Sequence, residues 1–143
     1  MIFFNENQKT GNNELKGTLP DEIGMLFSLE LLILPNNFIT GTLPSTMNYL
    51  TKLRQLQVPD NWLSSPIPDS FFQIESLEHL TLRSNVFDGT IPSAIGNLTS
   101  LRKVSLQYNH FSGSIPATMG NLNQLGKNGL SEWNDLRDFA VTE

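Results

Sequence analysis

Hydrophobic and polar positions recur along this chain with a fixed period of 24 residues. The clearest unit is residues 77–100, and steps of 24 from its Asn85 and Pro92 always reach an asparagine or a proline. These positions are Asn13, Asn37, Asn61, Asn85 and Asn109, and Pro20, Pro44, Pro68, Pro92 and Pro116. A period of this length, held without a gap, predicts a solenoid whose units stack around one continuous core.

The repeat divides the chain into three parts. One partial and four full repeats fill residues 13–124, the full ones beginning at Leu29, Leu53, Leu77 and Leu101. Residues 1–12 read as an N-terminal flank or degenerate cap, since the inward positions hold polar residues. Residues 125–143 leave the register and are predicted to form a C-terminal helical cap.

Pairs of apolar residues spaced by two open each full repeat, which places both side chains on one face of a short strand. The pairs are Leu32 and Leu34, Leu56 and Val58, Leu80 and Leu82, and Val104 and Leu106. One strand per repeat is therefore predicted, with connections of about twenty residues that make neighbouring strands parallel. The repeating asparagines are expected to satisfy backbone groups at the bend that follows each strand.

A glycine, an aliphatic-proline pair and a short apolar stretch complete each unit. The glycines predict a bend with positive φ, and the prolines predict an extended step followed by about one turn of helix. Ser65 replaces the glycine in one repeat and precedes Pro66, so we expect that segment to bend differently, as neutral drift on a convex surface.

The repeated unit LxxLxLxxNxLxGxIPxxLxxLxx, as in residues 77–100 and 101–124, resembles the plant-specific class of leucine-rich repeats. That resemblance implies an α/β solenoid: a right-handed superhelix with a concave parallel β-sheet and short helical or 3-10 turns on its convex side. It further implies extracellular or cell-surface recognition of a ligand or protein, as in receptor-like kinase ectodomains and secreted enzyme inhibitors. The cysteine-bearing caps usual in secreted members are absent here.

Residues that flank the inward pairs must face the concave side of the solenoid. One such column alternates in charge through Glu30, Arg54, Glu78 and Arg102. These residues are expected to pair laterally as a device for register and solubility, at about 0–1 kcal/mol for each exposed pair.

The other concave columns grade from apolar near the N-terminus to polar and basic near the C-terminus. An apolar patch beside arginine and tyrosine is typical of a surface that binds protein or peptide. The predicted ligand-binding residues are Leu31, Ile33, Gln57, His79, Thr81, Arg83, Arg102, Ser105 and Tyr108. The alternative is that the N-terminal segment covers Leu31 and Ile33.

Composition excludes several other functions. A formal net charge of −5 argues against a nucleic-acid partner, and no run approaches the roughly 20 apolar residues of a membrane helix. His79 and His110 occupy different repeat columns without a triad, so no catalytic, metal or cofactor site is predicted. Residues 1–4 are too short and lack the basic start of a secretory signal.

The ends of the chain and one modification motif complete the prediction. Ser131 begins a stretch that reads as a helix, with Trp133 and Leu136 on one face, expected to pack on the last repeat or, alternatively, to bind a partner. At the other end, either residues 2–4 cover the first unit or further repeats precede Met1. Asn97 begins a glycosylation sequon, Asn-Leu-Thr.

Three functional hypotheses follow. The first is a non-enzymatic, monomeric recognition module that binds a protein or peptide through its concave face. The second is a fragment of a receptor-like kinase ectodomain involved in ligand sensing. The third, an ice-binding solenoid, requires regular arrays of like residues such as threonine, and the concave columns are too mixed for it.

Overall fold

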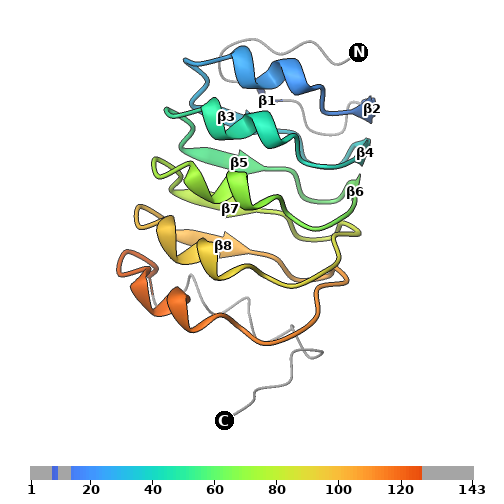
Figure 1. The fold of residues 1–143 in the computed structure, drawn as a ribbon. Helices are drawn as coiled ribbons and strands as arrows, with labels where there is room; N and C mark the ends of the chain where they lie inside the picture. Colours follow the sequence, from blue (N-terminus) through green and yellow to red (C-terminus); the bar gives the residue numbers. More distant parts are fainter. Residues whose placement is uncertain (1–7, 10–13, 127–143) are drawn as a thin grey trace.

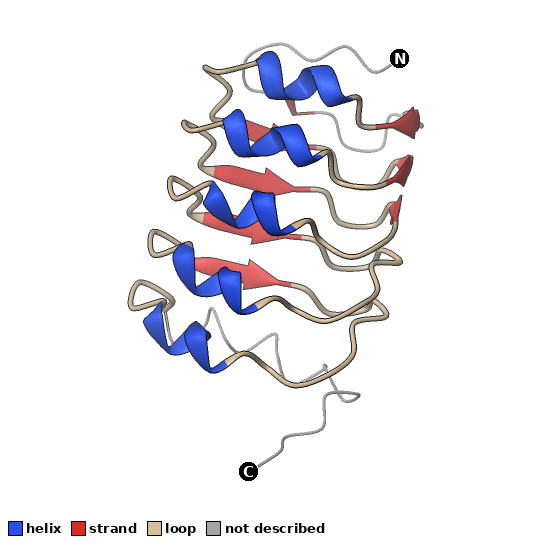
Figure 2. Ribbon diagram, viewed as in Figure 1, coloured by secondary structure: helices blue, strands red, loops and turns tan. Residues whose placement is uncertain are grey.

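The computed structural model describes residues 8–9 and 14–126, which form the predicted solenoid. Within these residues, successive turns stack side by side, with a parallel sheet along one side and short helices along the other (Figures 1 and 2). The predicted C-terminal helix from Ser131 and the apolar residues 2–4 lie outside the described residues.

The larger sheet confirms the predicted parallel strands, in the order β1-β3-β5-β7-β8. Its members are β1 (Gln8–Lys9), β3 (Leu31–Ile33), β5 (Gln55–Gln57), β7 (His79–Thr81) and β8 (Lys103–Ser105). Each pairing joins residues 24 apart, as in Leu56 with Leu80, so the sequence period is also the register of the sheet. Strand β1 forms even though its segment lacks the apolar pattern of the later strands.

A second parallel sheet was not anticipated, because one strand per repeat was expected. It contains β2 (Lys16–Thr18), β4 (Phe38–Gly41) and β6 (Trp62–Leu63), and bridges such as Ser64 with Val86 extend the same pairing to later turns. Its register joins residues 22 apart, as in Thr40 with Trp62. The register of this sheet therefore differs by two residues from that of the larger sheet, so side chains from different columns of the repeat lie beside each other here.

Short 3-10 helices follow the prolines, as predicted. They are η1 (Asp21–Met25), η2 (Ser45–Tyr49), η3 (Asp69–Gln73), η4 (Ser93–Asn97) and η5 (Ala117–Asn121). The preceding proline is extended, with ψ of 135° at Pro44, and its carbonyl accepts the first bond of the turn, from Met47 N–H at 3.1 Å. Each of these helices has five residues, slightly more than the three or four of most 3-10 runs.

The core lies between the larger sheet and the helices. Most turns contribute the same set of side chains: the inward strand pair, the residue two beyond the asparagine, the aliphatic residue before proline and the apolar residues of the helix. The last turn departs from this set, since Ile115 before its proline is 44% exposed. Phe87 and Phe111 occupy the same column of adjacent turns, where their rings stack with centroids 6.1 Å apart. Burial of these repeated columns is the main stabilising contribution to the fold.

The bend at the glycine column is shared by all the turns, including the one without glycine. Gly41 has a φ of +80° and Gly89 one of +73°, and Ser65 adopts nearly the same value, +70°. The expectation that Ser65-Pro66 bends differently is therefore wrong. The stacking neighbours impose the left-handed conformation on a serine, at a cost of about 1–2 kcal/mol.

Candidate functional site

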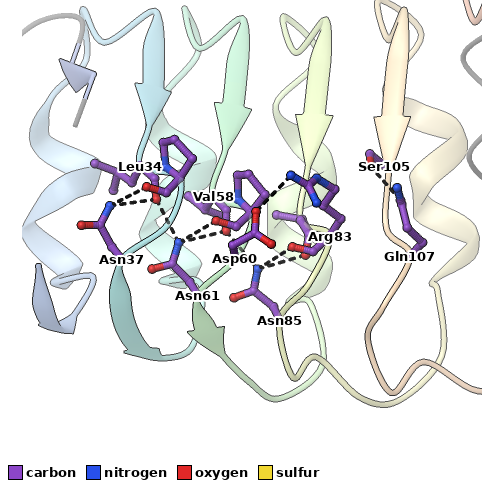
Figure 3. A network of polar contacts seen from close by, with 12 residues as sticks. Leu34, Asn37, Val58, Asp60, Asn61, Arg83, Asn85, Ser105 and Gln107 are labelled. Carbon is purple, nitrogen blue, oxygen red and sulfur yellow. Dashed lines mark hydrogen bonds and ion pairs between the residues drawn. The ribbon is translucent and has the colours of Figure 1, made fainter. Parts of the chain in front are cut away.

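The asparagine column lies at the end of the larger sheet and forms a continuous ladder (Figure 3). Asn61 Nδ2 lies within hydrogen-bonding distance of three carbonyl oxygens, those of Leu34, Val58 and Pro59, at 2.9, 3.2 and 3.1 Å. Its Oδ1 accepts a bond from Ile39 N–H, at 3.1 Å, in the preceding turn. Asn85 and Asn109 repeat the arrangement one and two turns later.

This ladder explains why the asparagines repeat. The amide of each side chain joins the bend of its own turn to the turn before it, and Asn37, Asn61 and Asn85 are buried. Buried polar groups are hydrogen-bonded in native proteins, and leaving one unmet costs about 1–3 kcal/mol. The ladder is therefore a structural element that fixes the edge of the candidate binding surface.

The N-terminal part of the concave face is apolar and partly open. Leu31 and Ile33 are half-buried on β3, on either side of the buried Leu32. On the next strand Gln57 is also half-buried, and its Nε2 donates to Gln55 Oε1 at 2.9 Å. This bond joins the two glutamine side chains, whose Cα atoms are registered opposite Leu31 and Ile33.

An ion pair joins Arg83, in the middle of the face, to Asp60 of the preceding turn, at the edge of the face. Arg83 Nη2 lies 3.0 Å from Asp60 Oδ2, both side chains being partly exposed (Figure 3). His79 is half-buried on β7, with its Cα registered opposite Gln55 and Lys103 on the adjacent strands. The pair holds the guanidinium over the exit from β7, where it remains accessible to a ligand.

The C-terminal part of the face differs from the prediction in two positions. Thr81 and Ser105 are 8% and 1% exposed, and Ser105 Oγ bonds to Gln107 Oε1 at 2.7 Å. Arg102 and Tyr108 are exposed, as a binding surface requires. Thr81 and Ser105 therefore offer little surface to a ligand, because small hydroxyl side chains do not rise above their longer neighbours.

In the alternating charged column, Arg54, Glu78 and Arg102 pair as predicted, and Glu30 acts on Arg54 through its charge. Arg54 Nε lies 2.8 Å from Glu78 Oε1, and Arg102 Nε lies 3.9 Å from Glu78 Oε2. The hydrogen bond from Arg54 lowers the pKa of Glu78. Desolvation of the carboxylate opposes this shift, and the charges of Arg54, Arg102 and His79 lower the pKa further. The same bond raises the pKa of Arg54. Glu78 is thus held ionised between two cations.

Sequence reasoning missed a lateral groove outside the concave face. It has a volume of about 480 Å³ and is lined by three of the ladder asparagines together with the residue on either side of each. Its lining residues are Asn36, Asn37, Phe38, Asp60, Asn61, Trp62, Ser84, Asn85 and Val86. Phe38 and Trp62 are 48% and 58% exposed, and large aromatic residues at a solvent-facing column were the signal that could have revealed it.

Two other kinds of site are absent from residues 8–9 and 14–126. Within those residues no group of histidine, cysteine, aspartate or glutamate side chains could hold a metal ion. No helix there is long and apolar enough to cross a membrane.

Comparison with known proteins relates this geometry to plant receptors. The chain is 34% identical to the leucine-rich repeat ectodomain of the receptor kinase GASSHO1/SCHENGEN3 from Arabidopsis thaliana, solved in complex with CASPARIAN STRIP INTEGRITY FACTOR 2, with a TM-score of 0.80 over 82% of this chain. It is 33% identical to the plant peptide hormone receptor RGFR1 in complex with RGF2, with a TM-score of 0.81 over 82% of this chain. The chain spans 14% and 19% of these two receptor chains.

A third similar structure has another activity. It is described as a plant ice-binding protein, 30% identical over 80% of this chain and 37% of that chain, with a TM-score of 0.75. No curated protein sequence gave a match. A family model described as a leucine-rich repeat region matches residues 12–127. With that match and the repeated unit of the structure, the chain belongs to the leucine-rich repeat family.

Proposed function

We propose that this chain is a non-enzymatic recognition module that binds a protein or peptide through its concave face. The observation that carries the proposal is the gradient on that face. Half-buried Leu31 and Ile33 lie at one end, and Arg83, Arg102 and exposed Tyr108 lie toward the other. Apolar area with aromatic and arginine anchors is the composition that dominates binding energy at protein interfaces. The two similar receptors were solved with a bound partner, which supports the same class of ligand here.

The residues divide into anchors and supports. Leu31 and Ile33 supply apolar surface, Arg83 and Arg102 supply bidentate donors for carboxylate or carbonyl groups, and Tyr108 supplies an aromatic face. Gln57 and His79 flank them with polar groups. Asp60 positions Arg83 by its ion pair.

The test uses peptides selected from a phage-displayed random library on the immobilised wild-type chain. We expect the double variant Ile33→Glu, Arg83→Glu to weaken the selected peptides at least about tenfold, since it adds charge to the apolar end and inverts the basic one. The double variant Ser45→Glu, Ser93→Glu changes exposed residues on the helices and serves as the control. Peptides that tolerate the concave variant and lose affinity for the control would place the binding surface on the helical side.

The second hypothesis, a receptor-like kinase ectodomain fragment, predicts secretion and glycosylation. Asn97 and Thr99 of the sequon are exposed at the end of η4, accessible to a glycosyltransferase. Expressed behind a secretory signal, the chain is expected to gain glycan mass that Asn97→Gln removes. Asn121 occupies the same repeat position without the sequon, so Asn121→Gln should leave the mass of the glycan unchanged. Sequencing the transcript on both sides of the coding region tests the receptor itself: an in-frame membrane helix and kinase would support it.

The similarity to an ice-binding protein is outweighed by the surface of this chain. Exposed threonines follow the glycine bend at Thr18, Thr42 and Thr90, but Pro66 interrupts the column. A regular array of like residues is therefore absent from this column, and peptide recognition is the function that the described surface favours.

A further inference from the structure

The outer face of the second sheet carries two exposed aromatic rings in different surroundings. Phe38 on β4 is registered opposite Lys16 on β2, and Trp62 on β6 is registered opposite Thr40 on β4. All four residues are exposed. Because partners in a parallel pair lie side by side, the residue opposite each ring determines what can cover it.

The first ring already binds a cation from within the chain. Lys16 Nζ lies 5.6 Å from the centroid of the Phe38 ring, within the range of a cation–π interaction. Thr40 holds the corresponding position beside Trp62, and its hydroxyl instead lies 3.4 Å from the carbonyl oxygen of Gly17. Threonine is too short to cover an indole, so Trp62 remains 58% exposed although its ring attracts cations more strongly than phenylalanine.

The charge of the groove favours the same kind of group. Asp60 is the one charged residue among those that line it, and its side chain is partly exposed. Arg83 approaches Asp60 Oδ2 from outside this lining set. Because Arg83 already neutralises part of the Asp60 charge, the open indole face is the main feature that favours a positively charged side chain, and the carboxylate adds to it.

We propose that the groove beside Trp62 binds a lysine or arginine side chain of a partner peptide, with the cation over the indole and near the Asp60 carboxylate. The proposal rests on the peptide recognition proposed above, and it adds a lateral contact outside the concave face. The groove runs beside the exits of the larger sheet, between the columns of Asn36 and Phe38, so a peptide on the concave face can reach it. The partner would thereby be selected for a basic residue at one position.

The test measures the groove directly on the full chain, labelled with nitrogen-15. Two probes are titrated: acetyl-Gly-Gly-Lys-Gly-Gly-amide and the same peptide with norleucine in place of lysine, which keeps the aliphatic stem and removes the charge. The indole N–H signal of Trp62 is identified by its loss in Trp62→Phe. We expect the lysine peptide to shift this signal and to bind about two- to fivefold more tightly than the norleucine peptide.

Two variants give matched outcomes. Thr40→Lys places a tethered cation beside Trp62, as Lys16 is placed beside Phe38, and should abolish the response to the lysine peptide. Ser112→Lys is the control, because Ser112 has the same repeat position and likewise contacts a glycine carbonyl, Gly89 O at 3.3 Å, but lies three turns away. It should preserve the response, with both variants melting cooperatively like the wild type.

Three results would overturn the proposal: equal shifts from the two peptides, no shift from either, or an undiminished response in Thr40→Lys. Equal shifts would make the groove an apolar patch without preference for charge. The titration uses no concave-face residue, so its outcome is separate from that of the Ile33→Glu, Arg83→Glu experiment. Either proposal can fail while the other stands.

Discussion

At the scale of single residues, the ladder asparagines show how one side chain can join two turns. Asn61 accepts from the turn before it and approaches carbonyl groups of both turns, so no other side chain of similar size can replace it. Aspartate lacks the amide donor, and glutamine is longer by one methylene group. The repeat of asparagine thus follows from hydrogen-bonding geometry alone.

The first prediction concerns this residue. Asn61→Ala leaves the buried Ile39 N–H without its acceptor, whereas the carbonyl of Leu34 keeps a bond from Asn37 Nδ2 at 3.2 Å. We expect a loss of about 1–3 kcal/mol in the free energy of unfolding, from one unmet buried donor. Urea denaturation followed by circular dichroism measures it. Asn48→Ala is the control, since the bond from Asn48 to Gln73 is exposed and its loss should change stability by under about 0.5 kcal/mol.

The second prediction compares two glycines at the same position of the helices. A Cβ on Gly96 would lie 2.6 Å from Thr118 O and 2.7 Å from Thr118 Cβ, whereas a Cβ on Gly120 would meet nothing within 4 Å. Gly96→Ala should therefore destabilise the chain by about 1–3 kcal/mol through overpacking. Gly120→Ala should be neutral or stabilise it by up to about 1 kcal/mol. Equal melting temperatures for the two variants would contradict this packing argument.

At the scale of elements, the sequence predicted the sheet whose strands pair 24 residues apart and missed the sheet whose strands pair 22 residues apart. Strand pairs such as Leu80 and Leu82 share one spacing in every unit, so the larger sheet and the 3-10 helices could be predicted from the period. The second sheet pairs residues 22 apart, as in Lys16 with Phe38, and no column of the 24-residue pattern contains that pairing. This difference in register explains why the groove beside Trp62 was not predicted.

Burial within the candidate site was also beyond the pattern. Alternation predicted that Thr81 and Ser105 face outward, but alternation carries no information on the height of neighbouring side chains. The positive φ of Ser65 is a similar case, since the neighbouring turns impose it against the preference of serine.

The third prediction belongs to the charged column between strands. Arg54 lowers the pKa of Glu78 in the folded protein below its unfolded value, so the carboxylate stabilises the fold above the unfolded pKa. That contribution is lost as pH falls through the folded pKa. We expect the melting temperature of the wild type to exceed that of Glu78→Gln at neutral pH and to converge with it in acid. High salt should reduce the same difference, because the pair is exposed.

At the scale of the whole molecule, each turn contacts only its neighbours, so local damage should remain local. Leu80 is fully buried in the middle of the solenoid, and Leu80→Ala should cost about 2–5 kcal/mol. Because each turn packs only on the turns before and after it, the variant should loosen its own turn and those two neighbours. We therefore expect backbone amide exchange to accelerate most in residues 53–124 and least in residues 14–28. Hydrogen exchange monitored by mass spectrometry measures both segments in one sample. A uniform acceleration would mean that the turns unfold as one cooperative unit. The two proposed binding surfaces would then be lost together, with the same free energy of unfolding.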